Sequence, residues 1–263
     1  MRFPWNGCIP LSEIFHIGVI ALVKSGGFIV GVASILGLPE KTVSGAFRVL
    51  RESGLMTSGA RGVNAPDMTD LDASRMLIAM LVDERPPYAE TSVRDFATLV
   101  CTDIHLAQPS EYLPEEERAT FERATSNFTL RGRGLPEPHT LEQAVAELIR
   151  MYGDDCEKEY WRHSQIDMGE RGLFDPHTEI EIIANTLSAR ISMNGNVYHY
   201  SDSLIAPDSW GDGETIEDIE ADLDAEDAHE LKRSRHAKAI NTIRSVDSRQ
   251  IAALARLLRE ARE

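Results

Sequence analysis

The chain has 263 residues, 42% of them hydrophobic and 27% charged, so it can bury a core of its own and is too polar for an integral membrane protein. Its longest apolar stretch, residues 14–23, is too short to cross a bilayer. A formal net charge of -16 argues against polyanion binding over the whole surface, and three widely spaced cysteines predict free thiols and a cytoplasmic location.

Only the two ends of the chain are cationic. Residues 1–65 hold six Lys/Arg against three Asp/Glu, and residues 231–263 hold nine against three. The segments between them are acidic, and residues 206–230 contain eleven acids and no Lys or Arg. Because the middle of the chain repels phosphates, a contact with nucleic acid is expected to use one of the ends.

Three helices are predicted in the N-terminal segment. The first covers residues 11–24 and ends at the Gly-Gly pair 26–27, the second covers residues 30–36 and ends at Gly37, and the third starts after Pro39. In the third helix, apolar residues recur at helical spacing and small, polar or basic residues occupy the other side. The apolar residues are Val43, Ala46, Phe47 and Leu50.

This segment resembles the winged helix-turn-helix of bacterial and phage DNA-binding regulators. The resemblance rests on a small Ala33, on Gly37 four residues later and on the β-branched Val43 six residues after that. It continues through Phe47 and Leu50 to a Gly-Leu pair at 54–55 and covers about a quarter of the chain. The resemblance implies that the third helix reads DNA.

The resemblance also implies a wing after the third helix. Residues 55–57 are expected to form its first strand, residues 58–62 its tip and residues 63–65 its return, with Pro66 closing the unit. Short side chains on the reading helix let it approach base edges, and arginines reach phosphates. The expected DNA contacts are Lys41, Thr42, Ser44, Gly45, Arg48, Arg51, Arg61 and Asn64. A winged helix that binds protein, or a generic three-helix core, would show the same spacing.

The middle of the chain predicts a helical scaffold. A helix is expected with apolar residues from 71 to 82 and a start near Thr69 or Asp70, followed by short helices at 91–101 and 114–125. Thr140 and Gln143 form a predicted capping box for a helix at 141–151. The carboxylates, thiol and histidine between residues 154 and 163 lack the spacing that gathers metal ligands, so no metal or cofactor is expected.

A change to two-residue periodicity marks a small sheet. Residues 180–183 are predicted to form a strand. Residues 189–193 and 196–200 are predicted to form a hairpin around Asn194-Gly195, which is typical of a type I′ turn. Together they make a three-stranded antiparallel sheet.

The acidic tract is predicted to be a solvated linker, mobile or weakly helical, because its 25 residues contain few large apolar side chains. A competing interpretation is that it mimics the charge of DNA and holds the basic segments in check. A calcium loop is rejected, because Trp210 and Ile219 stand where oxygen ligands are needed.

The tail carries a basic cluster at residues 232–238 and then an amphipathic helix. Asp247 and Gln250 form a predicted capping box for this helix, whose apolar positions begin at Ile251. Such a helix packs on its own domain, self-associates or docks in a partner's groove. The preferred interpretation is a partner or dimer helix, without membrane binding.

These features predict a mainly α fold with a small antiparallel sheet (α+β). Residues 1–66 form the winged helix-turn-helix, 67–205 the α+β assembly domain, 206–230 the linker and 231–263 the basic C-terminal helices. The predicted function is a transcriptional regulator that binds specific double-stranded DNA as a homodimer. The alternative is a phage-type packaging or protein-interaction adaptor with little sequence specificity. No enzyme motif occurs, so no catalytic residue is expected.

Overall fold

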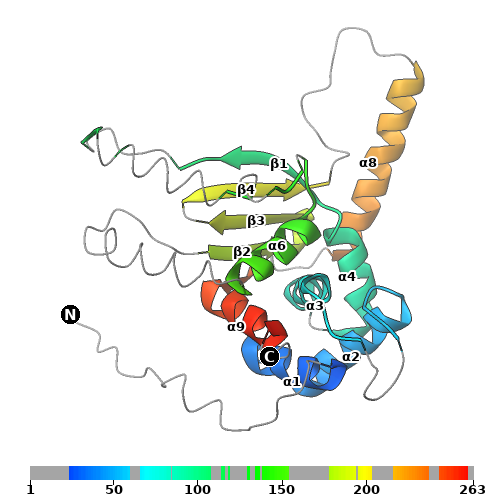
Figure 1. Cartoon of the computed structure of the whole chain (residues 1–263). Helices are drawn as coiled ribbons and strands as arrows, with labels where there is room; N and C mark the ends of the chain where they lie inside the picture. Colours follow the sequence, from blue (N-terminus) through cyan, green and yellow to red (C-terminus); the bar gives the residue numbers. More distant parts are fainter. Residues whose placement is uncertain are drawn as a thin grey trace, which may run out of the picture.

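Figure 1 shows the computed structural model of the chain, which is a mixed α+β fold. In the helix formed by residues 216–236, side chains are described only from Glu226 onward. The structure describes residues 24–59, 66–83, 85–107, 114–115, 118, 129–130, 134–136, 138–153, 178–193, 195–202, 216–236 and 243–259.

The sheet has five strands, and every neighbouring pair in it is antiparallel. Its spatial order is β1 (Val100–His105), β4 (Asn196–Ser201), β3 (Ser188–Met193), β2 (Thr178–Ile183) and β5 (Ile243–Asp247). The predicted strand and hairpin are β2 and the β3–β4 pair, so both are confirmed. The two outer strands, β1 and β5, enlarge the predicted three-stranded sheet.

Gly195 in the turn of the β3–β4 hairpin has the backbone that the predicted turn requires, whereas Asn194 lies outside the described residues. Gly195 adopts φ +79°, in the left-handed region that favours glycine. Met193 then pairs with Asn196, and the register continues to Ala189 opposite Tyr200. One face of each strand is thereby buried and the other is left partly exposed.

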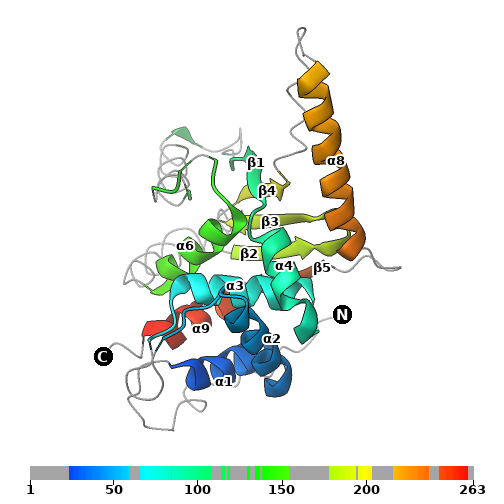
Figure 2. The same cartoon turned by 90° about the vertical axis from the view of Figure 1, so that its right-hand side faces the viewer.

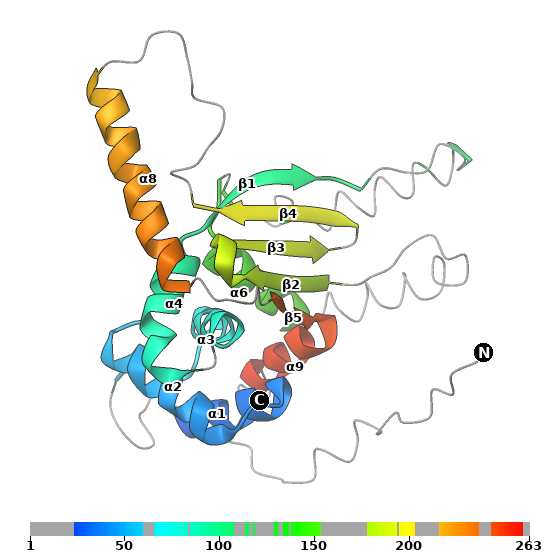
Figure 3. The same ribbon diagram turned by 180° about the vertical axis from the view of Figure 1, so that it is seen from behind.

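The buried face of the sheet packs against helices. α3 (Asp70–Val82) contacts β2 and β5, and α6 (Leu141–Gly153) packs on both α3 and α9 (Ser248–Arg259). Figures 2 and 3 show α6 on one side of the sheet, and we call the opposite side the outer face. Fully buried residues of the sheet side of this core include Ile180, Ile182, Ile191, Tyr198 and Tyr200.

Three capping boxes fix the starts of these helices. The Thr69 side chain accepts a hydrogen bond from the Asp72 amide (3.1 Å), which starts α3 within the range predicted. The predicted boxes at Thr140–Gln143 and Asp247–Gln250 are both formed. Among described residues, no helix has the length and apolar character of a membrane span.

α1 (Ser25–Leu36) and α2 (Glu40–Glu52) lie at the end of the molecule away from β1 (Figure 1). α1 packs on α2 and α9, and α2 packs on the 3-10 helix η3 (Pro86–Tyr88) and on α4 (Ala89–Phe96). The Gly-Gly pair at 26–27 lies inside the first turn of α1, so the prediction that it ends a helix is wrong. The predicted helix at 11–24 lies outside the described residues, apart from its last residue.

The apolar face of α9 is buried inside this chain. Ile251, Leu254, Ala255 and Leu258 are each at most 3% exposed and belong to the same core as α1 and α3. The preferred interpretation of this helix as a partner or dimer helix is therefore wrong, because the helix packs on the core of its own chain. A dimer surface, if one exists, must lie elsewhere.

The acidic tract is not a linker over its whole length. α8 (Ile216–His236) is one 21-residue helix that joins the second half of the tract to the basic cluster. Acidic residues near the start of a helix and basic residues in its last turn both suit the helix dipole. Figure 1 shows α8 extending away from α1 and α2, which does not support a tract that covers the basic N-terminal segment of its own chain.

Two further predictions are corrected. Residues 55–57 form no strand; instead the Thr57 amide donates to Asp72 Oδ1 (2.6 Å) and the Leu55 carbonyl accepts from Arg75 (2.9 Å). The predicted helix at 91–101 stops at Phe96, and the chain continues as β1. The predicted helix at 114–125 and the rest of the wing lie largely outside the described residues.

Candidate nucleic-acid interface

The turn between α1 and α2 depends on Gly37. This residue adopts φ +66° at the end of α1, where a side chain would be strained, and its amide and that of Leu38 bond to carbonyls of the last turn. Pro39 then stands before α2, and its carbonyl accepts from the Thr42 amide at 2.9 Å. Three residues thus reverse the chain and fix where α2 begins.

One side of α2 anchors the helix in the core. Val43, Ala46, Phe47 and Leu50 are each at most 3% exposed, as their spacing predicts. The ring of Phe47 lies 6.1 Å from that of Phe28 in α1, which ties the two helices together. α2 therefore cannot turn without losing this packing, so its opposite side is held in one orientation.

That opposite side is exposed and carries positive charge. Lys41, Ser44, Arg48 and Arg51 recur at helical spacing and are all exposed. Among the described residues, no carboxylate forms an ion pair with Lys41, Arg48 or Arg51. Arg51 lies over the Phe47 ring at 6.0 Å, so part of its side chain is positioned by the core. We call these four residues the α2 cationic face.

The remaining predicted contact residues fall into two groups. Thr42 is half-buried, and Gly45 faces η3, where a Cβ atom would lie 2.9 Å from the ring of Pro86. Gly45 is thus a packing residue, and we leave it out of the proposed contact surface. Arg61 and Asn64 lie outside the described residues.

Many of the other cations in the described chain are held by carboxylates, although Arg249 and Arg256 on α9 are exposed and, among described residues, form no ion pair. Arg259 pairs with Asp70 at 2.7 Å, and Arg75 pairs with Glu142. Arg150 bonds to Glu147 at 2.6 Å on its own helix. In these pairs the opposite charges neutralise each other, and the first two pairs also join separate elements of the fold. The α2 cationic face keeps its charge available.

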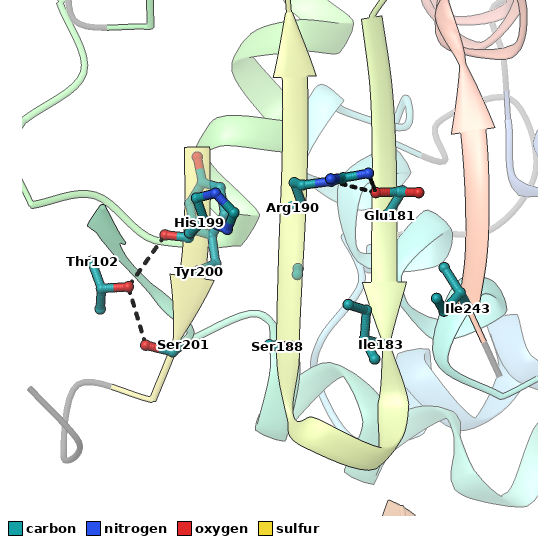
Figure 4. Close-up of a pocket in the computed structure, with 10 residues that line it drawn as sticks. Thr102, Glu181, Ile183, Ser188, Arg190, His199, Tyr200, Ser201 and Ile243 are labelled. Atoms are coloured by element: carbon teal, nitrogen blue, oxygen red, sulfur yellow. Dashed lines mark hydrogen bonds and ion pairs between the residues drawn. The ribbon is translucent and has the colours of Figure 1, made fainter. Parts of the chain in front are cut away.

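The outer face of the sheet contains a pocket of about 440 Å³ (Figure 4). It forms because Ser188 is small, whereas Arg190 on its own strand, Ile183 on the adjoining strand β2 and Ile243 on β5 beyond it are larger. Its lining residues are Thr102, Glu181, Ile183, Ser188, Ala189, Arg190, His199, Tyr200, Ser201 and Ile243.

The polar groups of this pocket largely satisfy one another. Arg190 forms an ion pair with Glu181, and the Thr102 hydroxyl donates to the His199 carbonyl (3.4 Å) while accepting from Ser201 (3.2 Å) (Figure 4). A ligand would have to break these bonds before it gained its own. The pocket therefore offers little to fix a ligand, despite its volume.

Buried titratable groups hold α8 to the domain. Lys232 donates to Asp202 at 2.9 Å and His229 lies 3.4 Å from the same carboxylate, while His236 bonds to Asp95 at 3.0 Å. Burial alone would raise the pKa of Asp202, but the hydrogen bonds and charges of Lys232 and His229 outweigh it and hold this pKa below its usual value. These contacts are structural.

A second buried pair lies beneath the sheet. His139 Nδ1 is 3.2 Å from the Pro136 carbonyl, which can only accept, so Nε2 accepts from the Tyr200 hydroxyl (2.9 Å). Burial raises the pKa of Tyr200 well above its usual value and keeps the phenol protonated. Neither buried cluster is predicted by the sequence, because the residues that pair in each are far apart in the chain.

No group of three or more His, Cys, Asp or Glu side chains in the described part of the chain is arranged to hold a metal ion. The carboxylates and histidine considered at residues 154–163 lie outside that part. A comparison with protein-family models, with curated proteins and with solved structures finds no match for this chain.

Proposed function

We propose that the protein binds double-stranded DNA through α2 and acts as a sequence-specific regulator. The observation that carries this proposal is the α2 cationic face, whose charges are unpaired among described residues and whose orientation is fixed by the buried opposite side. The major groove of B-DNA is about 12 Å wide and admits one helix of this kind. Ser44 lies between Lys41 and Arg48, and its short side chain allows close approach to base edges.

The charge of the remaining chain supports the same orientation. The net charge of -16 repels phosphates from most of the surface, so the approach to DNA is restricted to the two cationic ends of the chain, and the N-terminal end carries α2. Three cations on α2 release few counterions, so one copy binds weakly at cellular salt. We therefore propose a homodimer that places two α2 helices on one DNA site.

A second candidate is an adaptor that contacts DNA with little sequence specificity, as in phage DNA packaging. It is favoured by one observation: residues 55–57 form no wing strand, so the described structure has one reading element. Selection of DNA from a random pool separates the two. A palindromic consensus in the recovered DNA favours the regulator. Recovered DNA without a consensus, together with a mass in solution that corresponds to a ring of many subunits, favours the adaptor.

The central experiment is the double variant Lys41→Ala with Arg48→Ala. Binding should fall at least tenfold, and the plot of log affinity against log salt should become less steep by about two, because each cation neutralises about one phosphate. The matched control, Arg190→Ala with Arg233→Ala, removes the same charge from the sheet and α8. The control should leave both quantities unchanged.

Circular dichroism and thermal unfolding of both double variants establish that folding is intact. Binding and salt dependence that stay at the wild-type level in the Lys41/Arg48 variant would remove α2 from DNA recognition. An equal loss in the two double variants would show that net charge, and not the α2 cationic face, drives binding.

A further inference from the structure

The 3-10 helix η3 packs on α2 beside the α2 cationic face. Gly45 lies on the border of that face, one residue after Ser44, and approaches Pro86 so closely that a Cβ would be 2.9 Å from its ring. Pro86 and Pro87 restrict the backbone of η3, and α4 follows directly and also packs on α2. A ligand held against α2 therefore meets η3 on one flank.

Arg85, which directly precedes η3, is held in place by Asp83 and Tyr88. Asp83 is 7% exposed and accepts from the Arg85 amide (2.9 Å), from its Nε (3.0 Å) and, through the other oxygen, from its Nη2 (2.6 Å). The Arg85 guanidinium also lies 4.3 Å above the ring of Tyr88. Few exposed arginines are fixed on two sides in this way, because the side chain normally loses entropy when it is ordered.

Two donors of this assembly point to a ligand outside the fold. Among described residues, Arg85 Nη1 and the Tyr88 hydroxyl have no hydrogen-bond partner, and the Tyr88 residue is 48% exposed. The Asp83 oxygens already accept from Arg85, so the carboxylate presents little repulsion to an anion. A fixed guanidinium edge beside a phenol matches the oxygens of a phosphodiester, which only accept.

We propose that Arg85 and Tyr88 bind the phosphate backbone of DNA on the strand that flanks the groove entered by α2. This inference rests on the proposed function. Tyr88 donates through its hydroxyl and Arg85 through Nη1, so η3 takes the part in backbone contact that the resemblance assigned to a wing. Asp83 neutralises Arg85, so the pair fixes the position of the helix on DNA and adds little long-range attraction.

The test is Tyr88→Phe, which removes the hydroxyl and keeps the ring beneath Arg85. Affinity should fall about tenfold or more on every DNA sequence, as expected for one hydrogen bond to a charged group. The salt slope should stay at the wild-type value, because no cation is lost. Tyr88→Ala should weaken binding further, since Arg85 loses the ring that supports it. Thr98→Val, which removes another exposed hydroxyl near α4, is the control and should bind like wild type.

A single methylphosphonate, moved along the DNA site, locates the contact. The position at which this neutral group weakens wild-type binding should have a smaller effect in Tyr88→Phe, because only the Arg85 contact to that phosphate is then left to lose. Thermal unfolding checks that each variant is folded.

The outcomes separate the two proposals. Wild-type affinity in Tyr88→Phe, with binding lost in the Lys41/Arg48 variant, would overturn the inference and leave the proposed function standing. Lost binding in Tyr88→Phe with no effect in the Lys41/Arg48 variant would overturn the role of α2 and leave the phosphate contact. A change of oligomeric state in Tyr88→Phe with unchanged DNA affinity would assign Tyr88 to a protein contact instead.

Discussion

The α2 cationic face and the outer face of the sheet are both polar and partly exposed, but their charges are arranged differently. On the sheet, Arg190 is paired with Glu181 across neighbouring strands. On α2, Lys41 and Arg48 form no ion pair with any described carboxylate, although Glu40 and Glu52 stand at the two ends of the same helix. The sheet satisfies its own charges, and α2 does not.

This difference indicates where an outside partner is expected. A cation that already has a carboxylate partner adds little long-range attraction to a phosphate, so a paired arginine such as Arg85 can position a phosphate through a remaining N–H but does not drive binding by its charge. A cation in water beside no partner gains the full attraction and releases counterions. Pairing therefore indicates which charges can drive the attraction to an outside partner, even where their exposure is similar.

The largest expected effect is on the buried side of α2. Phe47→Ala should lower the free energy of unfolding by about 3–5 kcal/mol, because it opens a cavity against Phe28. Urea unfolding measures it. Lys41→Ala with Arg48→Ala should change that free energy by less than about 0.5 kcal/mol. A loss below about 1 kcal/mol in Phe47→Ala would show that α2 is not anchored as described, and would break the comparison between its two sides.

The next effect concerns the ion pair that holds α8. Asp202→Asn should cost about 1–3 kcal/mol at pH 7, because Lys232 and His229 lose a charged acceptor. The pKa of Asp202 is held below its usual value of about 3.9, so its stabilisation is present above that pH and is lost as the pH falls through the pKa in the folded state.

The difference between wild type and Asp202→Asn should therefore be full at pH 7 and shrink as the pH is lowered below about 4. Urea unfolding at a series of pH values measures this difference. Asp103→Asn, which neutralises an exposed carboxylate on β1, is the control and should cost less than about 1 kcal/mol. A cost for Asp202→Asn that does not vary with pH would mean that its charge is not what holds α8.

Much of the fold could be predicted from local signals. A capping box joins residues three apart and a hairpin turn joins neighbours, so Thr140, Asp247 and Gly195 were sufficient to place two helices and two strands. The apolar spacing of α2 likewise predicted its buried side, because helical periodicity is set by the backbone alone. These signals do not depend on the rest of the chain.

The elements that the sequence did not predict depend on distant partners. α8 looked like a linker because its composition is acidic, but His236 meets Asp95 at a separation of 141 residues and His229 meets Asp202 at 27. β1 pairs with β4, about 100 residues later in the chain. A helix such as α9 has the same sequence pattern whether it packs on α1 or on another protein. The spacing of its apolar residues therefore could not distinguish a helix of the core from a partner-binding helix.

Of the proposed DNA contacts, the exposure of Lys41, Ser44, Arg48 and Arg51 follows from helical spacing. The packing of Gly45 on Pro86 does not, because η3 comes 34 residues after α2 ends and no local pattern joins them. The arrangement of Arg85 over Tyr88 is not predicted by the sequence either, because the Arg-Pro-Pro-Tyr segment indicates only that a helix ends there.

A smaller effect tests the contact between α2 and η3. Gly45→Ala should cost about 1 kcal/mol, because the strain against the rigid Pro86 ring exceeds the gain in helix propensity. Gly31→Ala also meets a neighbour, at 2.5 Å, but that neighbour is the end of the flexible Leu257 side chain, so we expect a cost close to zero. DNA affinity should fall in Gly45→Ala alone. Equal effects of the two variants would show that η3 is free to move away from α2.

The smallest effect is expected on the outer face of the sheet. The side chains of Arg190 and Glu181 are 44% and 17% exposed, and pairs at such positions contribute at most about 1 kcal/mol. A double-mutant cycle of Arg190→Ala and Glu181→Ala should give a coupling of that size in urea unfolding, with DNA affinity unchanged in all three variants. Arg48→Ala is the matched case: it should weaken DNA binding and leave stability unchanged. If Arg190→Ala weakened DNA binding as much as Arg48→Ala, an internal ion pair would not shield a cation from DNA, and the α2 cationic face would lose the property that distinguishes it.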